Sequence, residues 1–216
     1  MKKYYIRNAI FDFDGTIVDS ETIYTKALYK TAKQMNALTD IDFHKLAGYQ
    51  TKDMYNIIAK THKIPEDFFY NTQIVFDSML ETELKLFDGV IETIQKFNNI
   101  VIASNSKIDY VQKIAKQQNI HQYIKNYSCH NDKLKAKPEP DLFLDAFKNL
   151  QDIDSQTTLE NTIIFEDSIA GVQAAKKTGI KIVAITNSYD KNILLENGAD
   201  IIVDKIDKVF EYIDII

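Results

Sequence analysis

Two aspartates separated by one residue lie near the N-terminus, Asp12 and Asp14. They end a mostly apolar run over residues 6–13 that predicts a short buried strand, and Gly15 then breaks it. Side chains alternate along a strand, so the two carboxylates share a face if the chain stays extended. Two buried acids are unfavourable unless a cation or a reaction uses them. The pair therefore indicates metal binding or acid–base chemistry, and the alternative is a solvated turn built on Asp14-Gly15.

Other polar side chains follow apolar segments much further along the chain. They are Ser104 with Asn105, Lys137, and Glu166 with Asp167. Each has an ordinary interpretation by itself: Ser104 as a helix cap, Lys137 as a surface lysine, and the acidic pair as an N-terminal helix cap. Taken together with the aspartate pair, these interpretations require four coincidences.

The elements that would position these residues alternate between strand and helix from residue 88 onward. Continuous apolar segments predict strands at 100–103, 162–165, 180–185 and 201–203. Amphipathic segments predict helices at 90–97, 108–115, 141–150 and 169–178, and residues 121–137 are ambiguous. This alternation predicts an α/β fold with a doubly wound, mostly parallel sheet covered on both faces. Ligands bind such sheets at the carboxyl ends of the strands, where the polar residues fall.

The segment between the aspartate pair and residue 86 has a different pattern. Its apolar spacing predicts helices over 20–36, around 54–58 and from Pro65 to about 86, without a strand. We therefore expect residues 1–17 and 86–216 to form an α/β catalytic core. Residues 18–85 are expected to form an inserted, all-helical cap domain.

With these elements in place, the sequence resembles the haloacid dehalogenase-like hydrolase superfamily, in its helical-cap phosphatase and β-phosphoglucomutase branch. The resemblance covers essentially the whole chain, and it implies a Rossmann-like core. Its specific parts are Asp12-Phe13-Asp14-Gly15-Thr16 and Phe165-Glu166-Asp167-Ser168 with Ala170-Gly171. Weaker parts are Ser104, Lys137-Pro138-Glu139-Pro140-Asp141 and the cap entry Asp19-Ser20-Glu21.

The resemblance implies a Mg²⁺-dependent phosphatase that acts on a small phosphorylated metabolite, such as a sugar phosphate. Asp12 would attack phosphorus and form an aspartyl-phosphate, and Asp14 would act as general acid and then general base. Asp12, the Asp14 carbonyl oxygen and Asp167 would bind Mg²⁺, with Glu166 acting through a water ligand. The phosphoryl oxygens would be held by Ser104, the backbone around Asn105 and Lys137.

Residues that differ from those expected in mutase members of this branch favour a hydrolase over the alternative, a phosphosugar mutase. Mutase relatives are expected to carry a histidine five residues after the aspartate that matches Asp19, and Tyr24 stands there. They also carry lysine and arginine in the cap loop, where this chain has Ala47 and Thr51. Halogen-removing relatives lack the second aspartate and the metal. A more distant alternative is a non-enzymatic phospho-acceptor or binding protein, although Asp14 would then have no role.

Composition excludes several other classes of function. The 216 residues are 45% hydrophobic and 26% charged, and no apolar run approaches the roughly 20 residues that cross a bilayer. A net charge of −5 with dispersed lysines argues against nucleic-acid binding. We therefore expect no membrane or nucleic-acid partner, and a monomer or weak homodimer.

The remaining cysteine and histidines carry less information. Cys129 is the only cysteine, which excludes an intrachain disulfide and fits a cytoplasmic location. The four histidines have no ligand-like spacing. The cap loop over residues 46–52 is the expected place for substrate contacts.

Overall fold

The structure is a computed structural model that describes residues 3–46 and 51–216. By its internal contacts the chain divides into two compact units, Met1–Val18 with Leu86–Ile216 and Asp19–Lys85. The strands are β1 (Tyr4–Ile6), β2 (Asn8–Phe11), β3 (Asn99–Ser104), β4 (Ile124–Cys129), β5 (Thr162–Glu166), β6 (Lys181–Ile185), β7 (Ile201–Val203) and β8 (Ile213–Ile215). The α-helices are α1 (Ser20–Met35), α2 (Thr51–Ile58), α3 (Phe68–Glu83), α4 (Val90–Ile94), α5 (Ile108–Gln117), α6 (Asp141–Ile153), α7 (Ile169–Lys176) and α8 (Lys191–Glu196). Short 3₁₀ helices are η1 (Phe43–Leu46), η2 (His121–Tyr123) and η3 (Ile206–Glu211).

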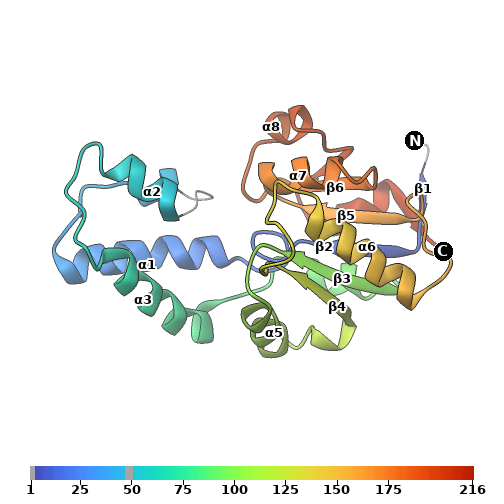
Figure 1. Ribbon diagram of the computed structural model, residues 1–216, viewed down its shortest axis with the longest axis horizontal. Helices are drawn as coiled ribbons and strands as arrows, with labels where there is room; N and C mark the ends of the chain where they lie inside the picture. Colours follow the sequence, from blue (N-terminus) through green and yellow to red (C-terminus); the bar gives the residue numbers. More distant parts are fainter. Residues whose placement is uncertain (1–2, 47–50) are drawn as a thin grey trace. The chain divides into compact units, whose positions relative to one another are not determined.

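The first unit contains a six-stranded, wholly parallel sheet in the order β4-β3-β2-β5-β6-β7 (Figure 1). The strand β2, which carries the aspartate pair at its end, lies inside the sheet between β3 and β5. The order changes direction at β2, and ligands of open α/β sheets bind at such a point. This arrangement confirms the predicted doubly wound α/β fold.

The two faces of the sheet have different cores. On one face, Ile10 and Ile164 pack with residues of α6 and α7, such as Phe143 and Val172. Alternate residues of the same strands point to the opposite face, where the rings of Phe11 and Phe165 stack at 4.3 Å. All of these side chains are fully buried, so the sheet is closely packed on both faces up to the ends of these strands.

Strand register determines which residues emerge side by side at the carboxyl edge. Phe11 of β2 pairs with Ile102 of β3 and with Phe165 of β5. Asp12 and Glu166 each come one residue after this level, and the Asp12 amide donates to the Phe165 carbonyl at 2.9 Å. The paired backbones therefore place these two carboxylates next to each other.

The prediction of one continuous strand from residue 6 was wrong in detail. β1 and β2 are separated at Arg7, whose amide and that of Asn8 both donate to the Asn161 carbonyl, at 2.8 and 3.2 Å. The Arg7 side chain also forms an ion pair with Asp154 at 2.5 Å. β1 thus leaves the main sheet and pairs in parallel with β8, and apolar pattern alone cannot indicate such a break.

The ambiguous region around residue 124 contains the edge strand β4. Its exposed side chains at Lys125 and Asn126 interrupt the apolar pattern, because an edge strand has one open side. Ser128 and Cys129, at its carboxyl end, are buried.

Described residues of the second unit form helices and loops without a strand. α1 begins after Asp19, whose side chain accepts a hydrogen bond from the Thr22 amide at 3.2 Å, and ends at Asn36 in the left-handed conformation. Leu28 of α1 and Phe68 of α3 belong to a separate apolar core. Each unit therefore has its own core, and in the part of the chain that is described no helix is long and apolar enough to span a membrane.

Candidate active site

The carboxyl ends of β2 and β5 bring together three acidic side chains that are far apart in the sequence. Carboxylate oxygens of Asp12, Glu166 and Asp167 lie within 4.8 Å of one another, and all three residues are buried. This spacing is suitable for one cation, and carboxylate oxygens are the ligands that Mg²⁺ prefers. Asp12 and Asp167, 155 positions apart by their residue numbers, are therefore close enough to share an ion.

Lys137 reaches the same cluster from the segment before α6. Its ammonium group donates to Asp12 Oδ1 and, at 2.7 Å, to Glu166 Oε1. It also lies over the Phe143 ring, 4.7 Å from the ring centre. Burial by itself lowers the pKa of Lys137, but the two carboxylates more than reverse this effect and raise its pKa. The lysine is therefore held as a cation.

One lysine does not balance three buried carboxylates. Burial raises the pKa of Asp12 to about 8, with Glu166 adding to the rise and Lys137 opposing it. Burial, Glu166 and Asp12 also raise the pKa of Asp167 well above its ordinary value. The site therefore favours additional positive charge, and its oxygen donors fit a hard divalent cation.

Glu166 is fixed from two sides. Its Oε2 accepts hydrogen bonds from the amides of Asp167 and Ser168, at 2.9 and 2.8 Å, and from the Ser168 hydroxyl at 3.0 Å. Gly171 in α7 leaves the space that this side chain fills, because a Cβ there would lie 1.7 Å from Glu166 Oε1. Ser168 caps α7 by accepting from the Gly171 amide at 3.0 Å. The strand end and the helix start therefore orient this carboxylate together.

Asp167 is oriented by two hydroxyl groups. Thr16 donates to its Oδ1 at 2.9 Å, and Ser188 donates to its Oδ2. Gly15 has a φ of +87°, and a Cβ at this position would lie 2.2 Å from Asp167 Oδ2. Asn187 donates to the Gly15 carbonyl at 2.7 Å. The turn after Asp14 requires glycine both for its conformation and for the close approach of this carboxylate.

Asp14 is half-buried and lies outside the three-carboxylate cluster. Ser106 donates to its Oδ2 at 2.7 Å, and Tyr110 donates to its Oδ1 at 2.9 Å. The two aspartates of the pair thus have different surroundings: Asp12 contacts an ammonium group, and the contacts of Asp14 include two neutral hydroxyl groups. Different roles for the two carboxylates follow from this difference.

Ser104 is the last residue of β3, which pairs with β2, and Asn105 follows it. The Ser104 hydroxyl, which is buried, accepts from the Ser106 amide at 3.0 Å. The side-chain oxygen of Asn105 accepts from the Lys137 amide at 2.8 Å, so this residue positions the segment that carries the lysine. All seven side chains predicted from the sequence are thus found around the carboxyl ends of three neighbouring strands.

Sequence reasoning did not assign roles to several residues that support the site. They are Thr16, Ser106, Tyr110, Gly171, Asn187 and Ser188. For the last two a signal was present, since Thr186-Asn187-Ser188 is a polar cluster directly after the strand β6. Tyr110 gave no signal, because an aromatic residue in an amphipathic helix is as easily explained by packing.

Comparison with known proteins identifies the family to which the chain belongs. The family model described as "Haloacid dehalogenase-like hydrolase" matches residues 9–185, which include every carboxylate above. The chain belongs to the haloacid dehalogenase-like hydrolase family. The match extends from β2 to the end of β6, and this range contains the charged residues of the site described above.

Individual relatives of this haloacid dehalogenase-like hydrolase are distant but align over most of their length. A phosphorylated carbohydrates phosphatase of Thermotoga maritima is 26% identical over 201 residues, covering 88% of this chain and 90% of the relative. Glycerol-1-phosphate phosphohydrolase 2 of Saccharomyces cerevisiae is 27% identical over 213 residues, covering 92% and 82%. A haloacid dehalogenase-like protein of unknown function from Agrobacterium tumefaciens has the same fold, with a TM-score of 0.80 at 20% identity and coverage of 95% and 96%.

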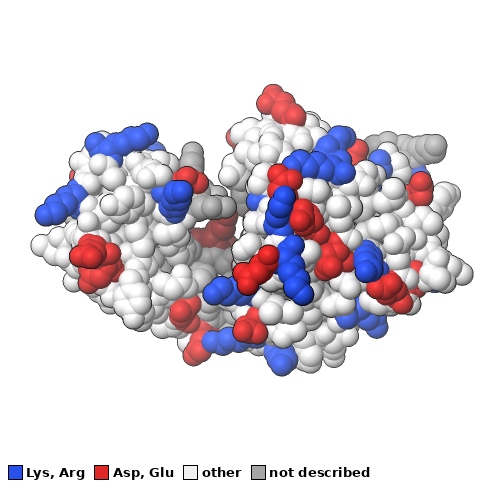
Figure 2. Space-filling view, in the orientation of Figure 1, with Lys and Arg blue, Asp and Glu red and all other residues white. Residues whose placement is uncertain are grey.

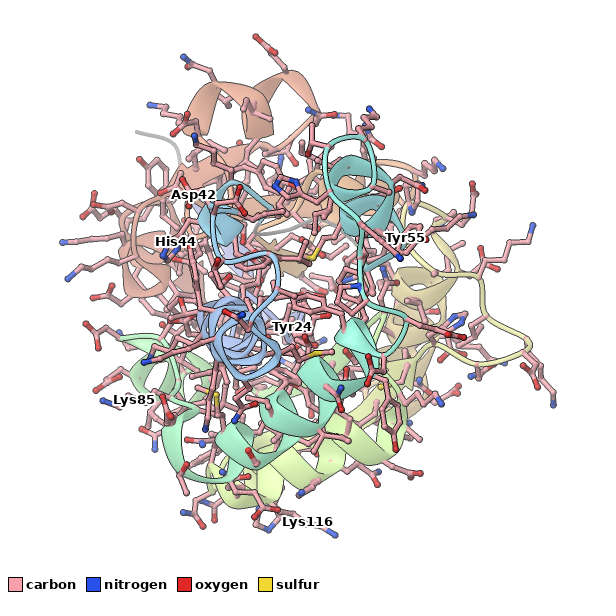
Figure 3. The ribbon with its side chains drawn as sticks, turned by 90° about the vertical axis from the view of Figure 1, so that its left-hand side faces the viewer. Tyr24, Asp42, His44, Tyr55, Lys85 and Lys116 are labelled. Carbon is pink, nitrogen blue, oxygen red and sulfur yellow. The ribbon has the colours of Figure 1, made fainter. Side chains whose placement is uncertain are left out.

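In the helical unit of this haloacid dehalogenase-like hydrolase, Tyr24 takes the place at which mutase relatives were expected to have histidine. Its hydroxyl lies 3.5 Å from that of Thr51, and its ring packs edge-on against Phe76. Burial raises the pKa of Tyr24. Figure 3 shows Tyr24 on α1, away from Asp42 and His44. Those two residues lie beside each other, and the His44 amide donates to Asp42 at 3.2 Å. Of the expected substrate loop 46–52, residues 47–50, Ala47 included, lie outside the described residues.

Two further features of the hydrolase core agree with ordinary surface and packing roles. Burial and the nearby Asp14 raise the pKa of the Cys129 thiol to about 12, so it is a poor nucleophile at neutral pH. On the face of the α/β unit seen in Figure 2, basic and acidic side chains alternate, and the described residues there form no continuous basic stripe.

Proposed function

We propose that this chain is a Mg²⁺-dependent phosphatase that hydrolyses a small phosphorylated metabolite through an aspartyl-phosphate on Asp12. The observation that carries the proposal is the buried cluster of Asp12, Glu166 and Asp167, with Lys137 bound to two of its members. A nucleophile, a cation site and a fixed positive charge within one group of contacts are what phosphoryl transfer requires.

Asp12 and Asp167 would bind Mg²⁺ directly, together with the Asp14 carbonyl oxygen, and Glu166 would complete the site. The raised pKa values of Asp12 and Asp167 support this assignment, because they reflect uncompensated negative charge. When bound, the ion would supply positive charge that offsets repulsion between the anionic nucleophile and the anionic ester.

The side chains themselves divide the reaction into two steps. Asp12 attacks phosphorus while Asp14 gives a proton to the departing ester oxygen. Asp14, now ionised, then takes a proton from the water that hydrolyses the aspartyl-phosphate. Lys137 holds Asp12 in position and, with the Ser104 hydroxyl and the backbone of Asn105, binds the phosphoryl oxygens.

The substrate class is inferred from the relatives. The Thermotoga maritima and Saccharomyces cerevisiae proteins are described as acting on phosphorylated carbohydrates and on glycerol 1-phosphate. We therefore propose a sugar phosphate or polyol phosphate for this chain. Residues 18–85 are proposed to act as a cap that selects the substrate and controls access of water.

The enzyme is further proposed to be cytoplasmic and to act as a monomer or weak homodimer. Its single cysteine, Cys129, is buried and unable to form an intrachain disulfide, in keeping with a reducing compartment. Size-exclusion chromatography with light scattering tests the assembly.

The decisive experiment measures phosphate release from a panel of sugar phosphates, polyol phosphates and nucleotides with Mg²⁺ present. We expect turnover of at least one sugar or polyol phosphate, its loss on chelation, and its recovery when Mg²⁺ is added. Asp12→Asn is nearly isosteric and should abolish turnover in a folded protein. Retained turnover in this variant would exclude Asp12 as the nucleophile.

The same assay separates the alternatives. Isomer formation without net phosphate release would indicate a phosphosugar mutase. A stable phosphoprotein that forms without turnover would indicate a phospho-acceptor. Tyr24 and Thr51, whose hydroxyl groups lie 3.5 Å apart, stand where a mutase is expected to carry basic side chains, and this supports the hydrolase.

A further inference from the structure

Two hydroxyl groups from the segment after β3 contact opposite oxygens of Asp14. Tyr110 donates to Oδ1 at 2.9 Å, and Ser106 donates to Oδ2 at 2.7 Å. An ionised carboxylate has about four acceptor positions, whereas a protonated one has a single O–H on one of its two oxygens. In a carboxyl group that acts as both acid and base, the position of the proton therefore depends on which oxygen each hydrogen-bonding neighbour contacts.

The two donors differ in how firmly they are held. Tyr110 lies in the first turn of α5, and its ring packs edge-on against Phe13, with centres 6.4 Å apart and an interplanar angle of 88°. Phe13 is fully buried and adjoins Asp14 in the chain. The phenol is therefore fixed relative to the carboxylate by a rigid contact. Ser106 has one rotatable bond to its hydroxyl oxygen, which can accept a hydrogen bond as readily as it donates one.

Proton placement follows from this asymmetry. In the acid form of Asp14 that the proposed reaction requires, a donor on Oδ1 favours Oδ1 as the carbonyl-like oxygen and Oδ2 as the oxygen that carries the transferred proton. Ser106 can turn to accept from a protonated Oδ2, or yield to the substrate oxygen. We propose that Tyr110 is a positioning residue that reserves Asp14 Oδ2 for proton transfer. This inference rests on the proposed phosphatase function.

The proton balance is closed over the two steps. In the first, the Oδ2 proton passes to the ester oxygen as its bond to phosphorus breaks, and that oxygen keeps the bonding electron pair. In the second, water bonds to phosphorus and returns a proton to Oδ2 while the bond from phosphorus to Asp12 breaks. Tyr110 keeps its own proton in both steps.

The test compares two esters in Tyr110→Phe, a change that removes one oxygen and keeps the ring against Phe13. Departure of glycerol from glycerol 1-phosphate needs a proton, whereas p-nitrophenolate departs from p-nitrophenyl phosphate without one. We expect kcat/KM for glycerol 1-phosphate to fall about 10- to 100-fold, the size expected for a hydrogen bond to an ionised group. For p-nitrophenyl phosphate we expect a loss of less than about threefold. This parameter includes only the steps up to release of the alcohol.

Two control variants make the comparison specific. Tyr123→Phe removes a phenol that accepts from the exposed Gln95 side chain at 2.7 Å, and it should leave both esters unaffected. Ser106→Ala should cost glycerol 1-phosphate hydrolysis less than Tyr110→Phe does, because the Ser106 contact is the one released during transfer.

Each result decides between clear outcomes. An equal loss for both esters in Tyr110→Phe would indicate a merely structural role and overturn the inference, as would no loss for either. A larger selective loss in Ser106→Ala would reverse the assignment of the two oxygens and also overturn it. A wild-type protein that releases phosphate from no member of the panel of sugar phosphates, polyol phosphates and nucleotides refutes the proposed function, and this inference with it.

Discussion

Replacing the proposed nucleophile should make the metal-free protein more stable at alkaline pH. In the folded protein the pKa of Asp12 is raised from 3.8 to about 8, chiefly by burial. Between these values the folded state holds a proton that the unfolded state has released. The free energy of unfolding of the wild type therefore falls as pH rises through this range, and Asp12→Asn lacks this loss.

The magnitude follows from the width of that range. One pH unit corresponds to about 1.4 kcal/mol for one proton, so three units between pH 5 and pH 8 give at most about 4 kcal/mol. Between pH 5 and pH 8, the free energy of unfolding of the variant should therefore rise by about 2–4 kcal/mol relative to that of the wild type. The variant keeps the contact with Lys137, because Asn retains an oxygen that can accept from the ammonium group. Solvent screening takes little from this figure, since Asp12 is only 7% exposed.

Urea unfolding followed by circular dichroism, in chelator at pH 5, 6, 7 and 8, measures the difference. Asp132→Asn changes an exposed aspartate of the same unit and should give the wild-type pH dependence. Mg²⁺ should reduce the gap between wild type and Asp12→Asn, because the ion stabilises the ionised cluster. Parallel pH curves for Asp12→Asn and wild type in chelator would refute the reasoning, because they would mean that Asp12 is not held protonated by its surroundings.

Three other substitutions probe separate parts of the site, and a fourth serves as a control. Lys137→Met leaves buried carboxylates unpaired, and we expect a loss of about 3–5 kcal/mol in urea unfolding together with at least a 100-fold loss of kcat. Gly171→Ala forces Glu166 to move, and should cost about 1–3 kcal/mol and most of the activity. As a control, Gly179→Ala places a Cβ with nothing within 4 Å but at a φ of +78°, so it should cost some stability through backbone strain and keep activity. Ser188→Ala removes a donor to the metal-site carboxylate and should weaken Mg²⁺ binding about 10-fold by calorimetry.

Each of these expectations has a contrary result. A Lys137→Met protein as stable as wild type would show that the ammonium group is not needed to offset the carboxylates. Full activity in Gly171→Ala would mean that Glu166 has room to shift without consequence. Unchanged Mg²⁺ affinity in Ser188→Ala would limit that hydroxyl to a packing role.

The fold was accessible from the sequence because its inner strands are buried on both faces. Continuous apolar segments, as in β3 and β5, are a strong signal, and the site residues follow directly at their ends. Edge strands gave a weaker signal: exposed side chains interrupt the apolar pattern of β4, and β1 is separated from β2 by a break at Arg7. Such a break depends on a carbonyl group from residue 161, which local pattern does not contain.

The candidate site was predictable in its charged residues and less so in its supporting hydroxyl groups. Each charged residue has an ordinary interpretation by itself, but Asp12, Lys137 and Glu166 stand out together because they follow separate apolar segments in one α/β pattern. Ser188 and Tyr110 are of types that occur everywhere in proteins, and their roles depend on contacts with residues 21 and 96 positions away. Only the folded backbone brings those partners together.

The pairing of Phe11 with Ile102 and Phe165 has a consequence for how this molecule can change. The alignment of Asp12 and Glu166 is set by main-chain hydrogen bonds between paired strands, and these bonds do not depend on which side chains the strands carry. A single residue inserted within β5 would turn Glu166 to the opposite side of the sheet, whereas lengthening the turns at the far edge would leave it in place. Variation in length should therefore accumulate at the amino ends of these strands.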